Sequence, residues 1–188
     1  MKTKIGLSEN CSERLSSIKG LFLKRVNKVF LTLLLGLLFV SAMTIPTIMS
    51  LQSALNSFEP LTAAHLESLV TDEYPTAYLI QGEITTQGDG ASVVAIFDAS
   101  SIDMLYSNNP VMSQVELLKI TANAESDLPA SIDLYQLEVL SNLKYLLVEF
   151  EYDACGGSAD GCLASILEGI IQGTSSKITV IYSQSLPE

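Results

Sequence analysis

Two stretches of the chain carry the same spacing of apolar residues, 28 positions apart. The first stretch is 112–120 and the second is 140–148, and each apolar residue of the first matches one in the second at that offset. The apolar residues follow one another by three, three and two positions, which is the period of neither a pure helix nor a pure strand. This spacing predicts a chain that coils around an interior and then straightens into a short strand.

The second stretch is preceded by a longer run of the same kind. Its apolar residues are Leu128, Pro129, Ile132, Leu137, Leu140, Leu143, Leu146 and Val148. This pattern resembles the leucine-rich repeat family. In that family an asparagine closes the turn after the strand by bonding backbone groups. Asn123 holds the matching position in the first stretch, and Glu151 holds it in the second. The resemblance implies an α/β fold, a short and irregular solenoid with a parallel sheet on its concave face.

Two weaker units extend the pattern. Ile96 lies 22 residues before Leu118, and Ile181 lies 35 residues after Leu146. Repeats of this family are about 20–29 residues long, so the first step fits and the second requires an insertion. The alternative is an ordinary small α/β domain, for which a strand–crossover–strand order also predicts a parallel sheet.

The predicted strands define one outward face. Because side chains alternate along a strand, we expect Leu118, Ile120, Leu146 and Val148 to face the interior. The outward residues, which we predict to bind a partner, are Phe97, Leu117, Lys119, Tyr145, Leu147, Glu149 and Tyr182. An apolar and aromatic patch with few charges is typical of a protein-binding surface. The alternative is that an N-terminal helix covers this face.

Charge divides the chain into two parts of opposite sign. Residues 1–28 carry seven lysines and arginines and two glutamates, a net charge of +5, while the rest of the chain carries −16. No charged residue lies between Lys28 and Glu59. A transmembrane helix needs about 20 apolar residues, and Pro46 favours the end of a helix. We therefore predict a basic segment at 1–28 and a membrane-spanning segment at 29–49.

The basic segment also predicts the orientation in the membrane. Basic flanks stay on the cytoplasmic side, so we expect a single-pass protein with a cytoplasmic N-terminus and its C-terminal domain outside. A cleaved signal peptide is the alternative, because the small residues at 40–42 suit a cleavage site. In that case the remainder would be secreted.

The exported part is predicted to begin with helices. Residues 51–70 have a helical pattern that breaks at Pro60, a residue suited to the first position of a helix. We interpret 50–75 as a helical stalk or cap and 76–188 as the leucine-rich-repeat-like domain.

Cys155 and Cys162 flank a short glycine-rich loop in the exported part. Export to an oxidising compartment favours a disulfide between them. Free thiols and a metal site are the alternatives, although zinc needs four ligands and His65 is the only histidine. Apolar residues at helical spacing over 163–171 then predict a helix, followed by a strand at 177–182.

Composition and motifs exclude several functions. A net charge of −11 argues against nucleic-acid binding, and we find no phosphate-binding loop, catalytic triad or metal-ligand pattern. We therefore expect a protein-binding module rather than an enzyme, with no cofactor. Glu149, Glu151 and Asp153 alternate at a strand end, and we interpret them as a solvated acidic edge. The alternative functions are a small exported α/β enzyme or ligand sensor with a pocket near these acids, and a structural spacer.

Overall fold

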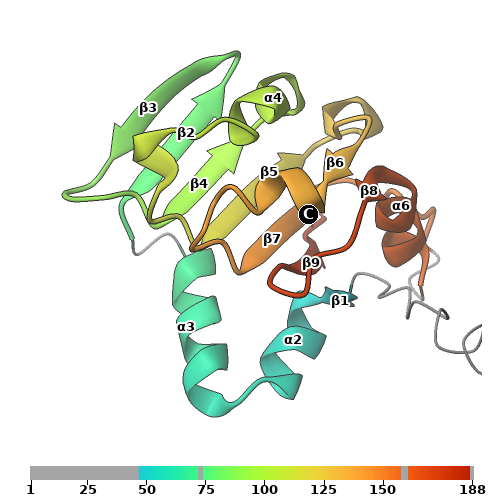
Figure 1. Cartoon of the computed structure of the whole chain (residues 1–188). Helices are drawn as coiled ribbons and strands as arrows, with labels where there is room; N and C mark the ends of the chain where they lie inside the picture. Colours follow the sequence, from blue (N-terminus) through green and yellow to red (C-terminus); the bar gives the residue numbers. More distant parts are fainter. Residues whose placement is uncertain (1–46, 72–73, 158–160, 187–188) are drawn as a thin grey trace, which may run out of the picture. The chain divides into compact units, whose positions relative to one another are not determined.

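The computed structural model describes residues 47–71, 74–157 and 161–186 (Figure 1). The predicted basic segment and all but the last residues of the predicted membrane segment lie outside these ranges. Within them no helix is long and apolar enough to span a bilayer. The described chain has an α/β fold around a mixed, mostly parallel sheet, which confirms the predicted fold class at this level.

In the part of the chain that the structure describes, seven strands form the main sheet. Their order across it is β1-β9-β7-β5-β4-β2-β3, and every neighbouring pair is parallel except β2 and β3. The strands are β1 (Ile48–Ser50), β2 (Thr76–Ile80), β3 (Glu83–Gln87), β4 (Val94–Phe97), β5 (Leu117–Ala122), β7 (Tyr145–Phe150) and β9 (Thr179–Gln184). From β2 onward, each parallel strand of the main sheet therefore lies beside the parallel strand that comes next in the chain.

The crossovers contain short helices and one small additional ladder. The helices are α4 (Ile102–Leu105), α5 (Leu134–Leu137) and α6 (Cys162–Ile170), with 3-10 turns η1 (Ala99–Ser101), η2 (Pro110–Met112) and η3 (Glu125–Asp127). A parallel pair of two-residue strands, β6 (Ile132–Asp133) and β8 (Ile171–Gln172), joins the last two crossovers.

The 28-residue spacing corresponds to the register between β5 and β7. Leu118 lies beside Leu146 and Ile120 beside Val148, and all six residue pairs of this parallel ladder have the same offset. All four of these side chains are buried in one hydrophobic cluster. The predicted pairing of the two best-matched stretches is therefore confirmed.

The two weaker units are displaced by one residue from the predicted register. Leu118 pairs with Ala95 rather than Ile96, and Leu146 pairs with Val180 rather than Ile181. The prediction is wrong here because both runs are apolar at nearly every position, so either register places apolar side chains inward. A shift of one residue exchanges the two faces of a strand.

The sheet is covered on both faces. On one face, residues from three successive crossovers, among them Leu105, Leu137 and Leu167, belong to a single buried cluster, and we call this side the interior face. On the other face, Ala54, Leu66 and Leu69 pack against the sheet. Those three residues belong to α2 (Leu51–Ser57) and α3 (Pro60–Val70), so we call this side the α2/α3 face.

The predicted break in the N-terminal helix is confirmed. Pro60 is the first residue of α3, and the Ser50 hydroxyl caps α2 by accepting a hydrogen bond of 3.1 Å from the Ser53 amide. Ala54 of α2 and Leu66 and Leu69 of α3 are buried in one cluster with residues of the sheet, so the two helices cover part of one face. Strand β1 starts at Ile48 and pairs with β9, so Ile48 and Met49 are part of the sheet and not of the membrane segment predicted at 29–49.

The hairpin of β2 and β3 was not predicted, because residues 83–87 have no apolar alternation. Its two-residue turn is formed by Gln81 and Gly82, whose φ angles are +53° and +78°. Positive φ at both positions is the signature of a type I′ turn, which matches the natural twist of a hairpin. The Gln-Gly pair is therefore the local signal that predicts this turn.

The predicted disulfide between Cys155 and Cys162 is present. It joins the loop after β7 to the first residue of α6. The apolar stripe predicted for this helix supplies Leu163 and Leu167 to the interior cluster. Gly173, with a φ angle of +72°, does not end this helix, because α6 ends at Ile170 and strand β8 lies between them.

Candidate functional site

Five of the seven predicted partner-binding residues share the α2/α3 face. They are Leu117, Lys119, Tyr145, Leu147 and Glu149, which alternate along the neighbouring strands β5 and β7. Phe97 and Tyr182 were placed on this face wrongly. Phe97 is buried in the interior cluster and Tyr182 packs against it, because the true register of β4 and β9 differs by one residue from the predicted one.

One half of the α2/α3 face is covered. Leu117 and Leu147 have no exposed surface and Tyr145 keeps 6% of its own, so the exposure that we predicted for these three is wrong. The Tyr145 ring lies 6.1 Å from the ring of Phe58, the residue after α2. We call the residues beneath the helices the covered half: Val94, Leu117, Tyr145, Leu147 and Ile181. For this half, the alternative of a covering N-terminal helix is correct.

An ionic cluster joins the covering helix to the sheet. The Glu116 carboxylate, directly before β5, lies 2.9 Å from Nε2 of His65 on α3 and accepts a hydrogen bond of 2.8 Å from Nζ of Lys144. Burial raises the pKa of Glu116, but the bonds from Lys144 and His65 outweigh it and hold that pKa below the ordinary value. The only histidine of the chain therefore serves this contact, at the amino ends of the strands.

The other half of the face is open. We call it the open half and define it by Ile80, Ile96, Lys119, Thr121 and Glu149, which lie toward the carboxyl ends of β2, β4, β5 and β7. Ile80 is 42% exposed. Lys119 Nζ lies 3.2 Å from Oε2 of Glu149, and the Thr121 hydroxyl donates a hydrogen bond of 3.3 Å to the same oxygen. This half therefore combines apolar side chains with one internally neutralised ion pair.

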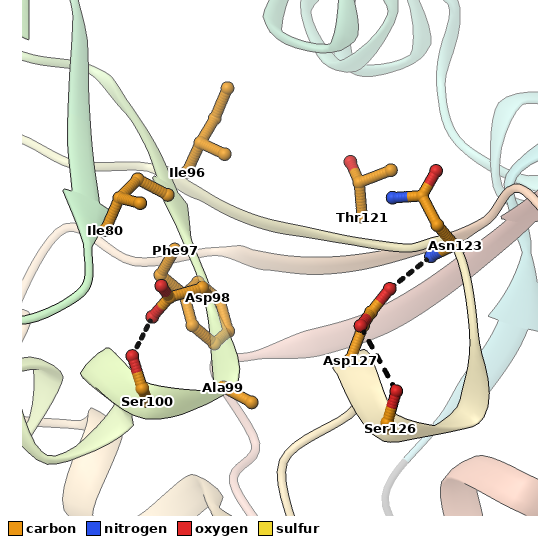
Figure 2. A pocket seen from close by; sticks show the side chains of 10 residues that line it. All are labelled: Ile80, Ile96, Phe97, Asp98, Ala99, Ser100, Thr121, Asn123, Ser126 and Asp127. Carbon is orange, nitrogen blue, oxygen red and sulfur yellow. Dashed lines mark hydrogen bonds between the residues drawn. The ribbon is translucent and has the colours of Figure 1, made fainter.

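A hollow of about 420 Å³ continues the open half at the carboxyl edge of the sheet (Figure 2). Its apolar lining includes Ile80, Ile96 and Phe97. Its polar lining comes from Thr121 near the end of β5 and from the segments that follow β4 and β5, namely Asp98, Ser100, Asn123, Ser126 and Asp127. The carboxyl ends of parallel strands are the usual ligand-binding edge of open α/β sheets.

Two aspartates shape the sides of this hollow. The Asp98 carboxylate accepts bonds of 2.8 Å from the Gln81 amide and from the Ser100 hydroxyl. Burial raises the pKa of Asp98, but these bonds and those from Ser101 outweigh it, so the pKa lies below its ordinary value and the group stays anionic. Asp98 thereby ties the β2–β3 turn to the segment after β4.

Asp127 closes the turn after β5. Its carboxylate accepts bonds of 2.8 Å and 3.0 Å from the amides of Asn123 and Ala124. The resemblance to leucine-rich repeats predicted that the Asn123 side chain would do this, and that prediction is wrong: Asn123 is exposed and lines the hollow. Instead, the carboxylate of Asp127, four residues further along the chain, accepts the hydrogen bonds that close this turn.

Several residues of the open half and of its hollow were missed by reasoning from the sequence. Ile80, Ile96, Asp98, Thr121 and Asp127 were not predicted as site residues. The signal that could have found Asp98 is its position directly after a predicted strand, where polar side chains of a parallel sheet converge.

The predicted acidic edge does not form one constellation. Glu149 is paired with Lys119, Glu151 is exposed, and the Asp153 carboxylate accepts bonds of 3.2 Å and 3.1 Å from the amides of Cys155 and Gly157. Asp153 therefore orders the loop of the disulfide.

Comparisons of the chain with protein families, with curated proteins and with solved structures found no significant match. The functional argument therefore depends on the geometry of the open half and its hollow.

Proposed function

We propose that this protein is an interaction module that binds another protein through the open half of its α2/α3 face. The observation that carries this proposal is Ile80, which is 42% exposed on the sheet beside the hollow. A soluble domain gains by covering such a side chain, and apolar anchors beside polar rims are typical of protein interfaces. Lys119 and Glu149 are the two predicted partner-binding residues that remain accessible in this half.

The surroundings of the hollow indicate the chemistry of the partner segment. Asp98 and Asp127 are both bonded to backbone amides and carry negative charge at two sides of an apolar floor. The chain beyond residue 28 also has a net charge of −16. A segment that inserts an apolar side chain flanked by lysine or arginine complements this arrangement.

We also propose that the α/β fold is a short, irregular solenoid of the leucine-rich-repeat kind. Three features support this proposal. Successive parallel strands are neighbours in the sheet, and the crossovers after β4, β5 and β7 share one interior cluster. The β6–β8 pair also links the crossover after β5 to the crossover after β7. The unequal offsets, 23 residues from β4 to β5 and 34 from β7 to β9, make the solenoid irregular.

We also propose a location at the membrane or outside it. The apolar segment that ends near Pro46 anchors the protein with its N-terminus in the cytoplasm, or is removed as a signal peptide so that the domain is secreted. Mass spectrometry of the mature N-terminus distinguishes the two. An N-terminus that begins after residue 42 indicates cleavage, and an intact leader indicates an anchor. Protease digestion restricted to one side of the membrane tests the orientation.

Site-specific crosslinking tests the binding proposal in the cells that make the protein. A photoreactive phenylalanine analogue replaces Ile80 in the full-length chain, and the matched control carries it at Tyr135, which is 73% exposed on α5. We expect a discrete adduct from position 80 that disappears with Ile96→Asp. Equal adducts from both positions, or an adduct that survives Ile96→Asp, would contradict the proposal.

A ligand sensor is the second candidate, and the hollow of about 420 Å³ at the carboxyl edge favours it. That volume suits a small molecule, and the acidic sides suit an amine or guanidine. Titration of the full-length chain with arginine and with agmatine, followed by thermal unfolding, tests this candidate. A rise in Tm that Asp98→Asn removes supports a sensor, and an unchanged Tm leaves the protein-binding module as the better proposal.

A further inference from the structure

Strand β3 forms one edge of the main sheet (Figure 1). Among the described residues it pairs with β2 alone, over five residues without a bulge. In a hairpin with a two-residue turn, the residues flanking the turn form a hydrogen-bonded pair, and bonded pairs then alternate with non-bonded ones. Ile80–Glu83, Tyr78–Thr85 and Thr76–Gln87 are therefore the bonded pairs. The amides and carbonyls of Ile84 and Thr86 consequently point away from the sheet.

This edge lacks the features with which proteins usually block strand pairing. Lysine, proline, bulges and very short strands are common protections of a sheet edge. The β3 sequence Glu-Ile-Thr-Thr-Gln has one charge, at its first residue, and two threonines, which favour extended backbone. The opposite edge, β1, is only three residues long. β3 is therefore the edge at which the sheet can be extended.

We propose that β3 pairs with β3 of a second copy of this chain, antiparallel and about a twofold axis at Thr85. In this register Ile84 of one copy bonds Thr86 of the other through their outward-facing backbone groups, twice by symmetry. It is the only antiparallel register that opposes all five residues of both strands. The sheets of the two copies then form one continuous sheet.

The side chains suit the same register. Thr85 lies opposite Thr85, a favourable cross-strand pair, and Glu83 lies opposite Gln87, so no like charges meet. A polar, five-residue edge buries little apolar surface, so the dimer is reversible rather than an aggregate. This dimer goes beyond the binding proposed above, because it uses the strand edge and not the open half of the face.

Cysteine crosslinking tests the axis directly. In the full-length chain carrying Cys11→Ser, the change Thr85→Cys places two thiols opposite each other at a non-bonded pair, where the Cβ atoms are about 4.5–5.5 Å apart. The matched control is Glu83→Cys, because in the proposed dimer residue 83 of one copy lies opposite Gln87 of the other copy and not opposite residue 83. After mild oxidation we expect at least tenfold more covalent dimer from Thr85→Cys than from Glu83→Cys on a non-reducing gel. Equal yields from the two variants would overturn the proposal.

A backbone variant provides the second test. Thr86→Pro removes an outward-facing amide that β2 does not use, so the hairpin is retained while the edge is blocked. We expect light scattering to show loss of the dimer with Tm within about 2 °C of the parent, since surface changes are usually small. A parent chain that stays monomeric, or a dimer that survives Thr86→Pro with normal Tm, would overturn the proposal. So would specific crosslinking of Thr85→Cys to a different protein, because that protein would then occupy the edge.

Discussion

The covered and open halves of the α2/α3 face are formed by the same strands but differ in their chemistry. Leu117 and Leu147 lie under α2 and α3 with no exposed surface, whereas Lys119 and Glu149, two residues further along the same strands, remain partly exposed. Strand alternation places all four on one face, but only the two leucines share a buried cluster with α2 and α3. A residue's face is thus a local property, while its accessibility depends on another part of the chain.

The largest expected effect is loss of a leucine from the covered half. Leu147→Ala removes a fully buried side chain and should lower the free energy of unfolding by about 3 kcal/mol. Ile80→Ala, in the open half, should cost less than about 1 kcal/mol because its side chain is already 42% exposed. Urea unfolding of both variants measures the difference. Similar losses would show that the two halves are equally packed.

The next effect comes from the opposite side of the sheet. Replacing both Cys155 and Cys162 with serine opens a ring of eight residues, and the loop-entropy relation gives a loss of about 2.5 kcal/mol. We expect the difference between Leu147→Ala and Ile80→Ala to persist in this background, because the disulfide contacts neither half of the face. Urea unfolding of the combined variants measures this. A difference that vanishes would show that the disulfide loop organises the covering helices.

A smaller effect is expected at the cluster that joins α3 to the sheet. Glu116→Gln should cost about 1 kcal/mol, since it removes charge from two hydrogen bonds at a partly exposed site. The folded pKa of Glu116 lies below its ordinary 4.5, so its contribution is present above that pH and is lost as the pH falls through the folded pKa. Parent and variant should therefore converge in stability in chemical unfolding as the pH falls below 4.5 and through the folded pKa. A constant gap down to pH 3 would contradict this role.

The smallest effect is expected from the ion pair in the open half. Glu149→Gln should change stability by no more than about 0.5 kcal/mol, because pairs near solvent contribute little. If this half is a binding surface, the same change should weaken the adduct formed from position 80 without altering Tm. The two halves then differ in kind, one serving stability and the other binding. A large loss of stability would remove that distinction.

Much of the sheet follows from short-range patterns. The pairing of Leu118 with Leu146 was predictable, because the two stretches share one spacing of apolar residues at an offset of 28. The runs at 92–97 and 178–182 are apolar at nearly every position, so their pattern permits two registers, and the predicted ones put Phe97 and Tyr182 on the wrong face. The site was less predictable than the sheet, because the hollow forms only where the segments after β4 and β5, which are far apart in the sequence, line one space.

The sequence alone determined the α/β class, the register between β5 and β7, the helix break at Pro60 and the pairing of Cys155 with Cys162. Each of these depends on local spacing or on side chains whose chemistry allows few partners. Only the tertiary structure decided which outward residues stay exposed. The reason is that α2 and α3 bury Tyr145 and Leu147 through contacts among Ala54, Leu66 and Leu69 that no spacing within the strands encodes.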